Sequence, residues 1–244
     1  MEKKKLTLCV DIGGSRIKAI VVDPKGQPVT ERVRLDTPRP ALPDTILDVI
    51  QQLAQKSGKF DRVSVGFPGV VQSGIVKTAP NLDPSWAGFN IDAALEASLK
   101  KPVRAANDAA VQGLGAISGK GLEMVITLGT GLGSSLAEDG RLSTHLELAH
   151  HPLRKGGTYE EQLGNAAIEK SGKKKWNRRI KTAIEALRIL TNFDHLYIGG
   201  GNARRVKFEL PKDVSLVSNE LGMRGGIWLW RERSPGSTDI FRKL

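Results

Sequence analysis

Asp11-Ile12-Gly13-Gly14-Ser15-Arg16-Ile17-Lys18 lies between two short apolar runs, and Leu128-Gly129-Thr130-Gly131-Leu132-Gly133 lies between two more. Each pattern predicts a strand, a tight turn and a second strand. Backbone N–H groups in such turns suit phosphate oxygens, and glycine removes the side chain that would block a close approach. One such turn alone could be an ordinary β-hairpin, whereas two turns facing each other across a cleft would hold a phosphoryl donor.

Length and composition indicate a folded globular protein. The 244 residues suffice for two modest lobes with a shared core, and 39% of them are hydrophobic and 26% charged. No apolar stretch approaches the ~20 residues of a membrane helix, and the apolar run near the N-terminus is too short for a signal peptide. Cys9 is the single cysteine, so no internal disulfide can form. We therefore expect a cytoplasmic protein.

The net charge of +11 is concentrated in one segment. Residues 170–212 hold twelve lysines and arginines against three acidic residues, which gives this basic segment a charge of +9. Such an excess is typical of a surface that binds a polyanion, although a solvated helix face rich in lysine gives the same pattern. From the charge alone both interpretations stay open.

Periodicity along the chain predicts two α/β halves. The first half reads as three antiparallel strands, a helix capped by Asp44, and a further strand, helix and strand. Apart from the Asp44 helix, its expected elements are Leu6–Val10, Ile17–Val22, Val29–Leu35, Arg62–Val65, Ile91–Leu99 and Val103–Ala106. The expected elements of the second half are a helix at Ala109–Ile117, two strands around Thr130, a helix at Lys173–Thr191, a strand at His195–Ile198 and a C-terminal helix within Gly222–Arg233. We expect a smaller lobe at residues 1–106, on which the C-terminal helix packs back, and a larger lobe at residues 107–244.

Asn107 and Asp108 lie between a predicted strand and a predicted helix. An aspartate at a helix start is a good cap, and capping alone would explain its presence. The functional interpretation is a general base, because a sugar hydroxyl must lose its proton as its oxygen attacks phosphorus. Asn107 could bind a neighbouring hydroxyl as both donor and acceptor.

Three further polar residues, two glutamates and a histidine, suit the binding of a sugar. Glu147, His150 and Glu160 follow the second glycine turn, and carboxylates accept hydrogen bonds from pairs of adjacent hydroxyls. Asp11 lies beside the first turn, where it could position a Mg²⁺ ion directly or through water. One cysteine and four histidines exclude a structural zinc cluster. The sequence contains neither a P-loop motif nor the protein-kinase motif set.

Taken in order, these motifs resemble those of the ROK sugar kinases, and within them the polyphosphate glucokinase branch. The matching segments run through almost the whole chain: Asp11–Lys18, Gly66–Gly69, Thr78–Leu82 with Trp86, Asn107–Ala109, Thr127–Gly133, Glu147–His151 and Ile198–Asn202. The resemblance implies an α/β fold of the two-lobed, actin-like ATPase type, related to ribonuclease H, with a cleft between the lobes. It also implies a Mg²⁺-dependent transfer of the terminal phosphoryl group of inorganic polyphosphate to the 6-hydroxyl of glucose.

The resemblance assigns roles to individual residues. Asp108 would be the catalytic base. Glucose would be bound by Gly69, Asn81, Asn107, Asp108, Glu147, His150 and Glu160. The donor phosphates would be bound by Gly13, Gly14, Ser15, Lys18, Thr130, Gly131, Gly200, Lys173, Lys174 and Lys175. Mg²⁺ near Asp11 would be the cofactor, and closure of the lobes would keep water from the phosphoryl group.

Two departures from the family pattern bear on this assignment. Typical ROK kinases carry a cysteine-rich zinc loop, whereas the stretch Pro152–Glu160 is short and lacks cysteine, as in the polyphosphate-using branch. We therefore expect no zinc. Ala149 stands where most relatives carry glycine, which puts the local turn in doubt.

We expect polyphosphate as the donor, because a lysine-rich segment can follow its charges as such segments follow a nucleic-acid backbone. An ATP-dependent glucokinase or a dual-donor glucomannokinase is the alternative, since both donors present phosphates to the same turns. A sugar-sensing ROK regulator would carry a DNA-binding domain before the first turn, and Asp11 leaves no room for one. Aromatic residues are few and no nucleic-acid motif is recognised, so the expected partners are glucose and polyphosphate rather than nucleic acid or membrane. The family also implies a homodimer, which nothing in the residues tests.

Overall fold

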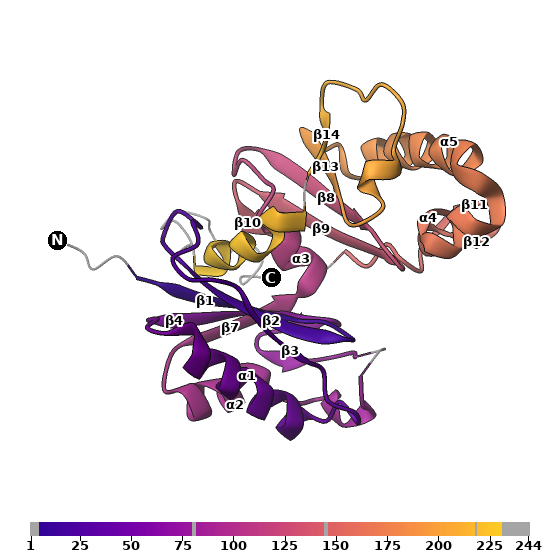
Figure 1. The fold of residues 1–244 in the computed structure, drawn as a ribbon. Helices are drawn as coiled ribbons and strands as arrows, with labels where there is room; N and C mark the ends of the chain where they lie inside the picture. The colour runs from indigo at the N-terminus through magenta and orange to yellow at the C-terminus, as the bar shows by residue number, and fades with distance from the viewer. Residues whose placement is uncertain (1–4, 80–81, 144–145, 218, 231–244) are drawn as a thin grey trace, which may run out of the picture.

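Two mixed five-stranded sheets form the framework of the protein (Figure 1). The structure is a computed structural model that describes residues 5–79, 82–143, 146–217 and 219–230. Within these ranges no helix combines the length and the apolar character needed to cross a bilayer.

The first sheet has the strand order β3-β2-β1-β4-β7. Its strands are β1 (Thr7–Ile12), β2 (Arg16–Val22), β3 (Val33–Asp36), β4 (Arg62–Phe67) and β7 (Val103–Asn107). The three strands β1 to β3 form an antiparallel meander, while β4 and β7 run parallel to β1. The chain therefore leaves the sheet at the ends of β1, β4 and β7 along the same edge, which is where Asp11 and Asn107 lie.

The second sheet repeats this arrangement with the strand order β10-β9-β8-β13-β14. Its strands are β8 (Leu122–Leu128), β9 (Leu132–Glu138), β10 (Arg141–Leu142), β13 (His195–Gly199) and β14 (Val214–Leu216). Again β8 to β10 are antiparallel, and β13 and β14 run parallel to β8. The duplicated α/β pattern expected from the sequence is confirmed, while β10 and β14 are two strands of this sheet that the sequence analysis did not predict.

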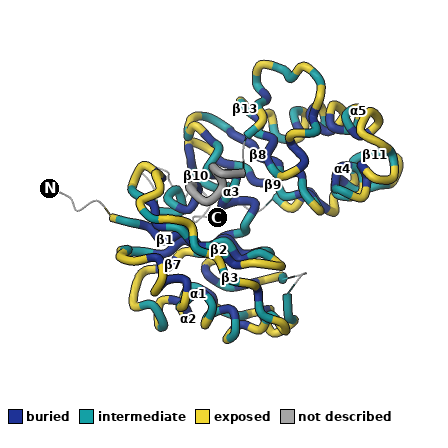
Figure 2. The backbone as a smooth tube through the Cα atoms, in the orientation of Figure 1, coloured by how far each residue is buried: buried dark blue, intermediate teal, exposed yellow. Residues whose placement is uncertain are grey.

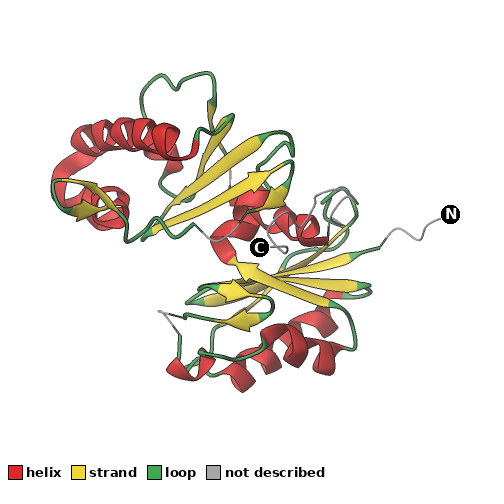
Figure 3. Cartoon of the chain, turned by 180° about the vertical axis from the view of Figure 1, so that it is seen from behind, coloured by secondary structure: helices red, strands yellow, loops and turns green. Residues whose placement is uncertain are grey.

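Helices cover the outer faces of both sheets and fill the space between them (Figures 1 and 3). The outer layers are α1 (Pro43–Ser57) and α2 (Ile91–Leu99) on the first sheet, and α4 (Tyr159–Leu163) and α5 (Asn165–Thr191) on the second. Between the sheets lie α3 (Asp108–Leu114) and the 3₁₀ helix η3 (Asn219–Trp230). Each outer layer buries its own apolar cluster, seen as dark blue along the sheets in Figure 2.

Smaller elements complete the fold. They are the hairpin β5 (Val71–Gln72) and β6 (Ile75–Val76), the hairpin β11 (Pro152–Arg154) and β12 (Gly157–Thr158), and the 3₁₀ turns η1 (Pro84–Trp86) and η2 (Ala203–Arg205).

Several element boundaries differ from those expected. Asp44 does not cap α1, because Pro43 occupies the first helical position and residue 42 precedes it without a side-chain cap. The third strand begins at Val33 rather than Val29. The N–H of Val21 donates to the hydroxyl of Thr30, so it is not available for a backbone hydrogen bond that would extend the β2–β3 pairing. In the second half, α5 begins before Lys173, and Gly172 interrupts it with a φ of 74°. The C-terminal segment is a 3₁₀ helix within the described residues rather than an α-helix.

Close backbone packing fixes α3 between the sheets. A Cβ atom on Gly225 of η3 would overlap the carbonyl oxygen of Val111, so only glycine allows η3 to approach α3 this closely. On the opposite side, a Cβ atom on Gly133 of β9 would overlap the methyl carbon of Ala109. Because both contacts involve the helix backbone or its shortest side chain, α3 has little freedom to shift along either neighbour.

The C-terminal helix η3 is also attached to the first sheet. The indole Nε1 of Trp230 donates to the hydroxyl of Ser64 over 2.8 Å, and that hydroxyl donates to the carbonyl oxygen of Gly226 over 2.7 Å. The guanidinium groups of Arg62 and Arg104 lie 5.0 and 4.5 Å from the centre of the Trp230 ring. The chain thus returns to the sheet on which it began, while the lobe boundary between residues 106 and 107 stays a prediction.

Replacing Gly225 by alanine should lower the free energy of unfolding by about 3 kcal/mol, because the added methyl group must displace either α3 or η3. Chemical denaturation would measure the change. Gly14→Ala is the matched control, since no heavy atom lies within 4 Å of the position its Cβ would take. Equal stability of the two variants would contradict the close packing of η3 on α3.

Candidate active site

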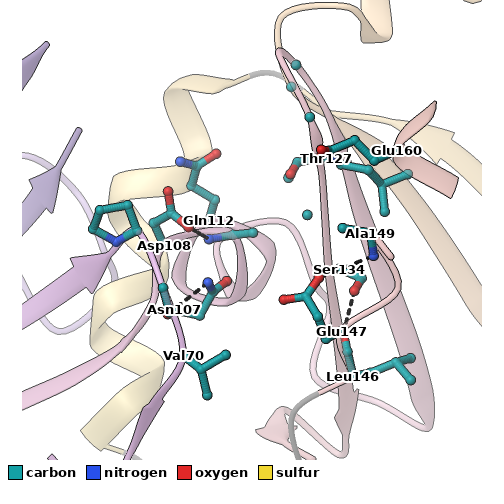
Figure 4. Close-up of a pocket in the computed structure, with 18 of the residues that line it drawn as sticks. Val70, Asn107, Asp108, Gln112, Thr127, Ser134, Leu146, Glu147, Ala149 and Glu160 are labelled. Carbon is teal, nitrogen blue, oxygen red and sulfur yellow. Dashed lines mark hydrogen bonds between the residues drawn. The ribbon is translucent and has the colours of Figure 1, made fainter. Parts of the chain in front are cut away.

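A cavity of about 420 Å³ lies between the two sheets, with α3 along one wall (Figure 4). The first half of the chain contributes Pro68, Gly69, Val70, Thr78, Asn107, Asp108, Ala109 and Gln112. The opposite wall consists of Thr127, Gly129, Gly131, Leu132, Gly133, Ser134, Leu146, Glu147, Ala149, His150, Glu160, Gly200 and Gly201. The cavity therefore brings together residues from both halves of the duplicated fold.

Asn107 and Asp108 lie where β7 ends and α3 begins. The cap of α3 is Asn107, whose Oδ1 accepts from the N–H of Ala110 over 3.1 Å. Its Nδ2 donates to the carbonyl oxygen of Gly69 over 3.1 Å and so holds the opposing loop in place. Helix capping, the alternative explanation for Asp108, is therefore the role of Asn107 and not of Asp108. The carboxylate of Asp108 is left to face the cavity (Figure 4).

The surroundings of Asp108 favour its protonated form more than water does. Burial is the main cause, and the negative charges of Asp11 and Glu147 act in the same direction. The N–H of Ala109, which donates to Oδ1 over 2.7 Å, opposes them. The net effect raises the pKa of Asp108 to about 6. A carboxylate with this pKa is ionised at neutral pH and is a stronger proton acceptor than an exposed aspartate.

Glu147 and Glu160 reach the cavity from the opposite wall (Figure 4), and His150 lines it as well. Ala149 links the two glutamates, because its N–H donates to Oε1 of Glu147 over 3.2 Å and its carbonyl accepts from the N–H of Glu160 over 2.9 Å. Oε2 of Glu160 also accepts from the N–H of Leu132 over 3.3 Å. The structure therefore brings the three residues together as the sequence predicts.

The turn at Ala149 forms without a glycine. The N–H of His151 donates to the carbonyl of Leu148 over 3.0 Å and closes the turn. Ala149 is not among the non-glycine residues with positive φ in the described part of the chain. Its side chain therefore brings no backbone strain, and the departure from the family pattern leaves the turn intact.

The second glycine turn borders the cavity. Gly129, Gly131 and Gly200 line it, whereas Thr130 does not. Gly200 has a φ of +87°, and a Cβ atom there would overlap the backbone of Leu128. Asn202 fixes this approach, because its side-chain Nδ2 donates to the carbonyl of Gly129 over 3.0 Å. The two glycine segments at the ends of β8 and β13 thus form one backbone surface, which suits a phosphate chain.

The first glycine turn lies outside the walls of this cavity. None of Gly13, Gly14, Ser15 and Lys18 lines it. The ammonium group of Lys18 lies 3.1 Å from Oδ2 of Asp11, so the lysine pairs with the carboxylate that follows the same strand. A role for these four residues in donor binding stays a prediction, and Lys18 would have to exchange Asp11 for phosphate.

The lysines of the basic segment also lie apart from the cavity. Lys173, Lys174 and Lys175 are exposed at the start of the second part of α5. Asn177 joins this part of α5 to the loop that follows Gly200, because its Nδ2 donates to the carbonyl of Arg205 over 3.0 Å. The three lysines are therefore placed on the lobe that carries the second glycine turn, outside the cavity itself.

A magnesium ion would find one protein ligand in this region. Within the described residues no group of three or more His, Cys, Asp or Glu side chains could hold a metal ion. Mg²⁺ commonly keeps several waters and binds one or two carboxylates together with substrate phosphates. Asp11, whose charge acts on Asp108, is a carboxylate of the type that suits such a site, but it does not line the cavity and its role stays a prediction.

Sequence reasoning missed several polar residues that line the cavity, namely Thr78, Gln112, Thr127 and Ser134. Gln112 could have been found, because it lies four residues after Asp108 in a predicted helix and so shares its face. Asn81, expected to contact glucose, lies outside the described residues.

Proteins with a similar sequence or fold are known. The polyphosphate glucokinase of Mycobacterium tuberculosis is 34% identical over 220 residues, which is 86% of this chain and 81% of that protein. The crystal structure of the inorganic polyphosphate/ATP-glucomannokinase of Arthrobacter sp. strain KM has a TM-score of 0.78 and 31% identity, covering 91% of this chain and 97% of that one. A ROK family glucokinase of Streptomyces griseus, in complex with glucose and AMPPNP, shares the fold at 20% identity and a TM-score of 0.72, covering 92% of this chain and 97% of that one.

The two-lobed, actin-like fold expected from the sequence is confirmed. The model of the ROK family matches residues 7–177, and the chain belongs to that family.

Proposed function

We propose that this protein is a polyphosphate glucokinase, which transfers the terminal phosphoryl group of inorganic polyphosphate to the 6-hydroxyl of glucose. The observation that carries the proposal is the partly buried carboxylate of Asp108, which lines a cavity together with Glu147, Glu160 and a glycine surface. The M. tuberculosis relative, a polyphosphate glucokinase, supports the choice of both substrates.

Glucose occupies the part of the cavity near Asn107 and Glu147. The carboxylates of Glu147 and Glu160 accept hydrogen bonds from its hydroxyl groups, and His150 and the loop at Gly69 complete the contacts. Because Ala149 connects the two glutamates through its backbone, they recognise the sugar as one rigid unit. In this proposal the 6-hydroxyl points toward Asp108.

Asp108 removes the proton of the 6-hydroxyl as the new bond from that oxygen to phosphorus forms. The bond from phosphorus to the bridging oxygen breaks, and the polyphosphate leaves one unit shorter. Gly131 and Gly200 present their backbone to the donor, while Gly13, Gly14, Ser15 and Thr130 contact it after the lobes close. Asp11 and the donor phosphates would hold a magnesium ion, which would supply positive charge to neutralise the donor.

The basic segment favours polyphosphate over ATP as the donor, because a long polyanion gains from each lysine that it passes. ATP remains the alternative, and the Arthrobacter neighbour, a polyphosphate/ATP-glucomannokinase, makes dual use the closest competing function. We further propose that the protein acts in the cytoplasm as a homodimer and needs no zinc.

Glucose 6-phosphate formation with Mg²⁺ tests the function directly. Polyphosphate and ATP should be compared at equal concentrations of donor chains, and we expect turnover with polyphosphate to exceed turnover with ATP. Turnover mainly with ATP would contradict the choice of donor. Phosphorylation of neither glucose nor mannose would contradict the proposed function.

Asp108→Asn should lower kcat by about 100- to 10,000-fold, because it removes the proton acceptor and keeps the shape. The dissociation constant of glucose, measured by titration calorimetry, should change little. Similar turnover in the variant and the parent would overturn the assignment of the base.

The pH profile provides the control for this variant. Asp108 must be ionised to accept a proton, so kcat/KM of the parent should fall as the pH drops below about 6. The residual activity of Asp108→Asn should lack this acidic limb. If kcat/KM of Asp108→Asn falls at acidic pH as it does in the parent, a group other than Asp108 causes the fall.

Replacing Lys173, Lys174 and Lys175 together by glutamine should raise the KM for long-chain polyphosphate more than for tripolyphosphate. The slope of the logarithm of affinity against the logarithm of salt concentration should fall by roughly two, at about 0.7 per lysine. The control replaces three exposed lysines on the first lobe, Lys56, Lys59 and Lys101. Equal effects on both chain lengths, or equal effects of the two triple variants, would show that the α5 lysines are ordinary surface charges.

A further inference from the structure

Gln112 lies on the catalytic face of α3 and has no role in the mechanism described so far. It follows Asp108 by four residues, which places both side chains on one face of the helix, and both line the cavity. Figure 4 shows Asn107, Asp108 and Gln112 in succession along one wall, with the Gln112 amide beside the Asp108 carboxylate and on the side away from Asn107. The glutamine therefore extends this wall beyond the base, away from the glucose end.

The amide of Gln112 has no partner in the part of the chain that the structure describes. The amide of Asn107, by contrast, uses its oxygen for Ala110 and its nitrogen for Gly69. A primary amide can make up to four hydrogen bonds, and the amide of Gln112 lines the cavity with this capacity unused by the described residues. An unpaired amide that lines a cavity next to a general base is thus available to a bound substrate.

The charges around the cavity indicate which substrate group it contacts. Asp108, Glu147 and Glu160 line the cavity, and among the described residues no lysine or arginine lines it. A phosphoryl group entering between these carboxylates needs hydrogen-bond donors. A lysine beside Asp108 would lower the pKa of the base and weaken it, whereas a neutral amide donates without this effect.

We propose that Gln112 is a catalytic residue that donates an N–H of its amide to a non-bridging oxygen of the phosphoryl group during its transfer. This inference rests on the proposed function. The contact tightens as the negative charge of the transferred group shifts in the transition state, so it acts on kcat more than on glucose binding.

Three variants measured with polyphosphate and glucose test the role. Gln112→Ala should lower kcat roughly 10- to 150-fold, the value of one hydrogen bond to a charged group, and leave the KM for glucose unchanged. Gln112→Glu should lower kcat further, because a carboxylate repels the phosphoryl group. It should also move the acidic limb of the kcat/KM profile to higher pH, because a second negative charge raises the pKa of Asp108. Gln52→Glu, an exposed position on α1, introduces the same charge and should match the parent.

The outcomes separate this inference from the proposed function. Activity of the parent tests the function, and only the ratio of each variant to the parent tests Gln112. A rise in the KM for glucose at constant kcat would place Gln112 on the sugar and overturn the proposal. Parent-like kinetics of Gln112→Ala, or an acidic limb that Gln112→Glu leaves in place, would also overturn it. Thermal unfolding of each variant verifies that the comparison is made on folded protein.

Discussion

The position of α3 between two backbones is the constraint on which the site depends. Gly225 lets η3 touch the carbonyl of Val111, and Gly133 lets β9 touch the methyl group of Ala109. A helix held on two sides at van der Waals contact cannot rotate, so the direction of its first residue is fixed. Asp108 is that residue. Its neighbour Ala109 contacts Gly133, which follows the second glycine turn in β9, so Asp108 lines the same cavity as that turn.

This packing also explains the electrostatics of the cavity. A helix start enclosed by two sheets is poorly solvated, and burial is the main reason that the pKa of Asp108 rises. The positive charge of the chain is then kept away from the base, on the exposed side of α5, and Lys18 is paired with Asp11. Neutral donors, namely backbone N–H groups and one amide, are left beside Asp108. The base stays strong while a polyanion can still be attracted over a longer range.

Sequence reasoning predicted what depends on local patterns. The strand–turn–strand units, the long helix and the convergence of Glu147, His150 and Glu160 all follow from short motifs. It failed where a tertiary contact decides. The cap of α3 is Asn107 because its side chain also binds Gly69, which lies 38 residues earlier in the chain. Lys18 pairs with Asp11 because the β1–β2 register places them opposite each other, a fact that no spacing along the sequence reveals.

The duplicated topology has not produced two equivalent phosphate sites. Both halves end their first strand in a glycine turn, but the first turn is hydrogen-bonded within its own lobe and lies outside the cavity, with Gly14 and Ser15 exposed. Thr37 donates to the carbonyl of Gly13 over 2.6 Å, and Arg39 donates to the carbonyl of Gly14 over 3.2 Å. The second turn is instead joined to a second glycine segment through Asn202 and opens onto the cavity. One copy of the motif therefore carries the charged pair of Asp11 and Lys18 near the base, and the other provides an uncharged surface of backbone. The proposed transfer, from a bridging oxygen of polyphosphate to a hydroxyl oxygen of glucose, uses both properties at different places, and the two unequal copies of the turn supply them.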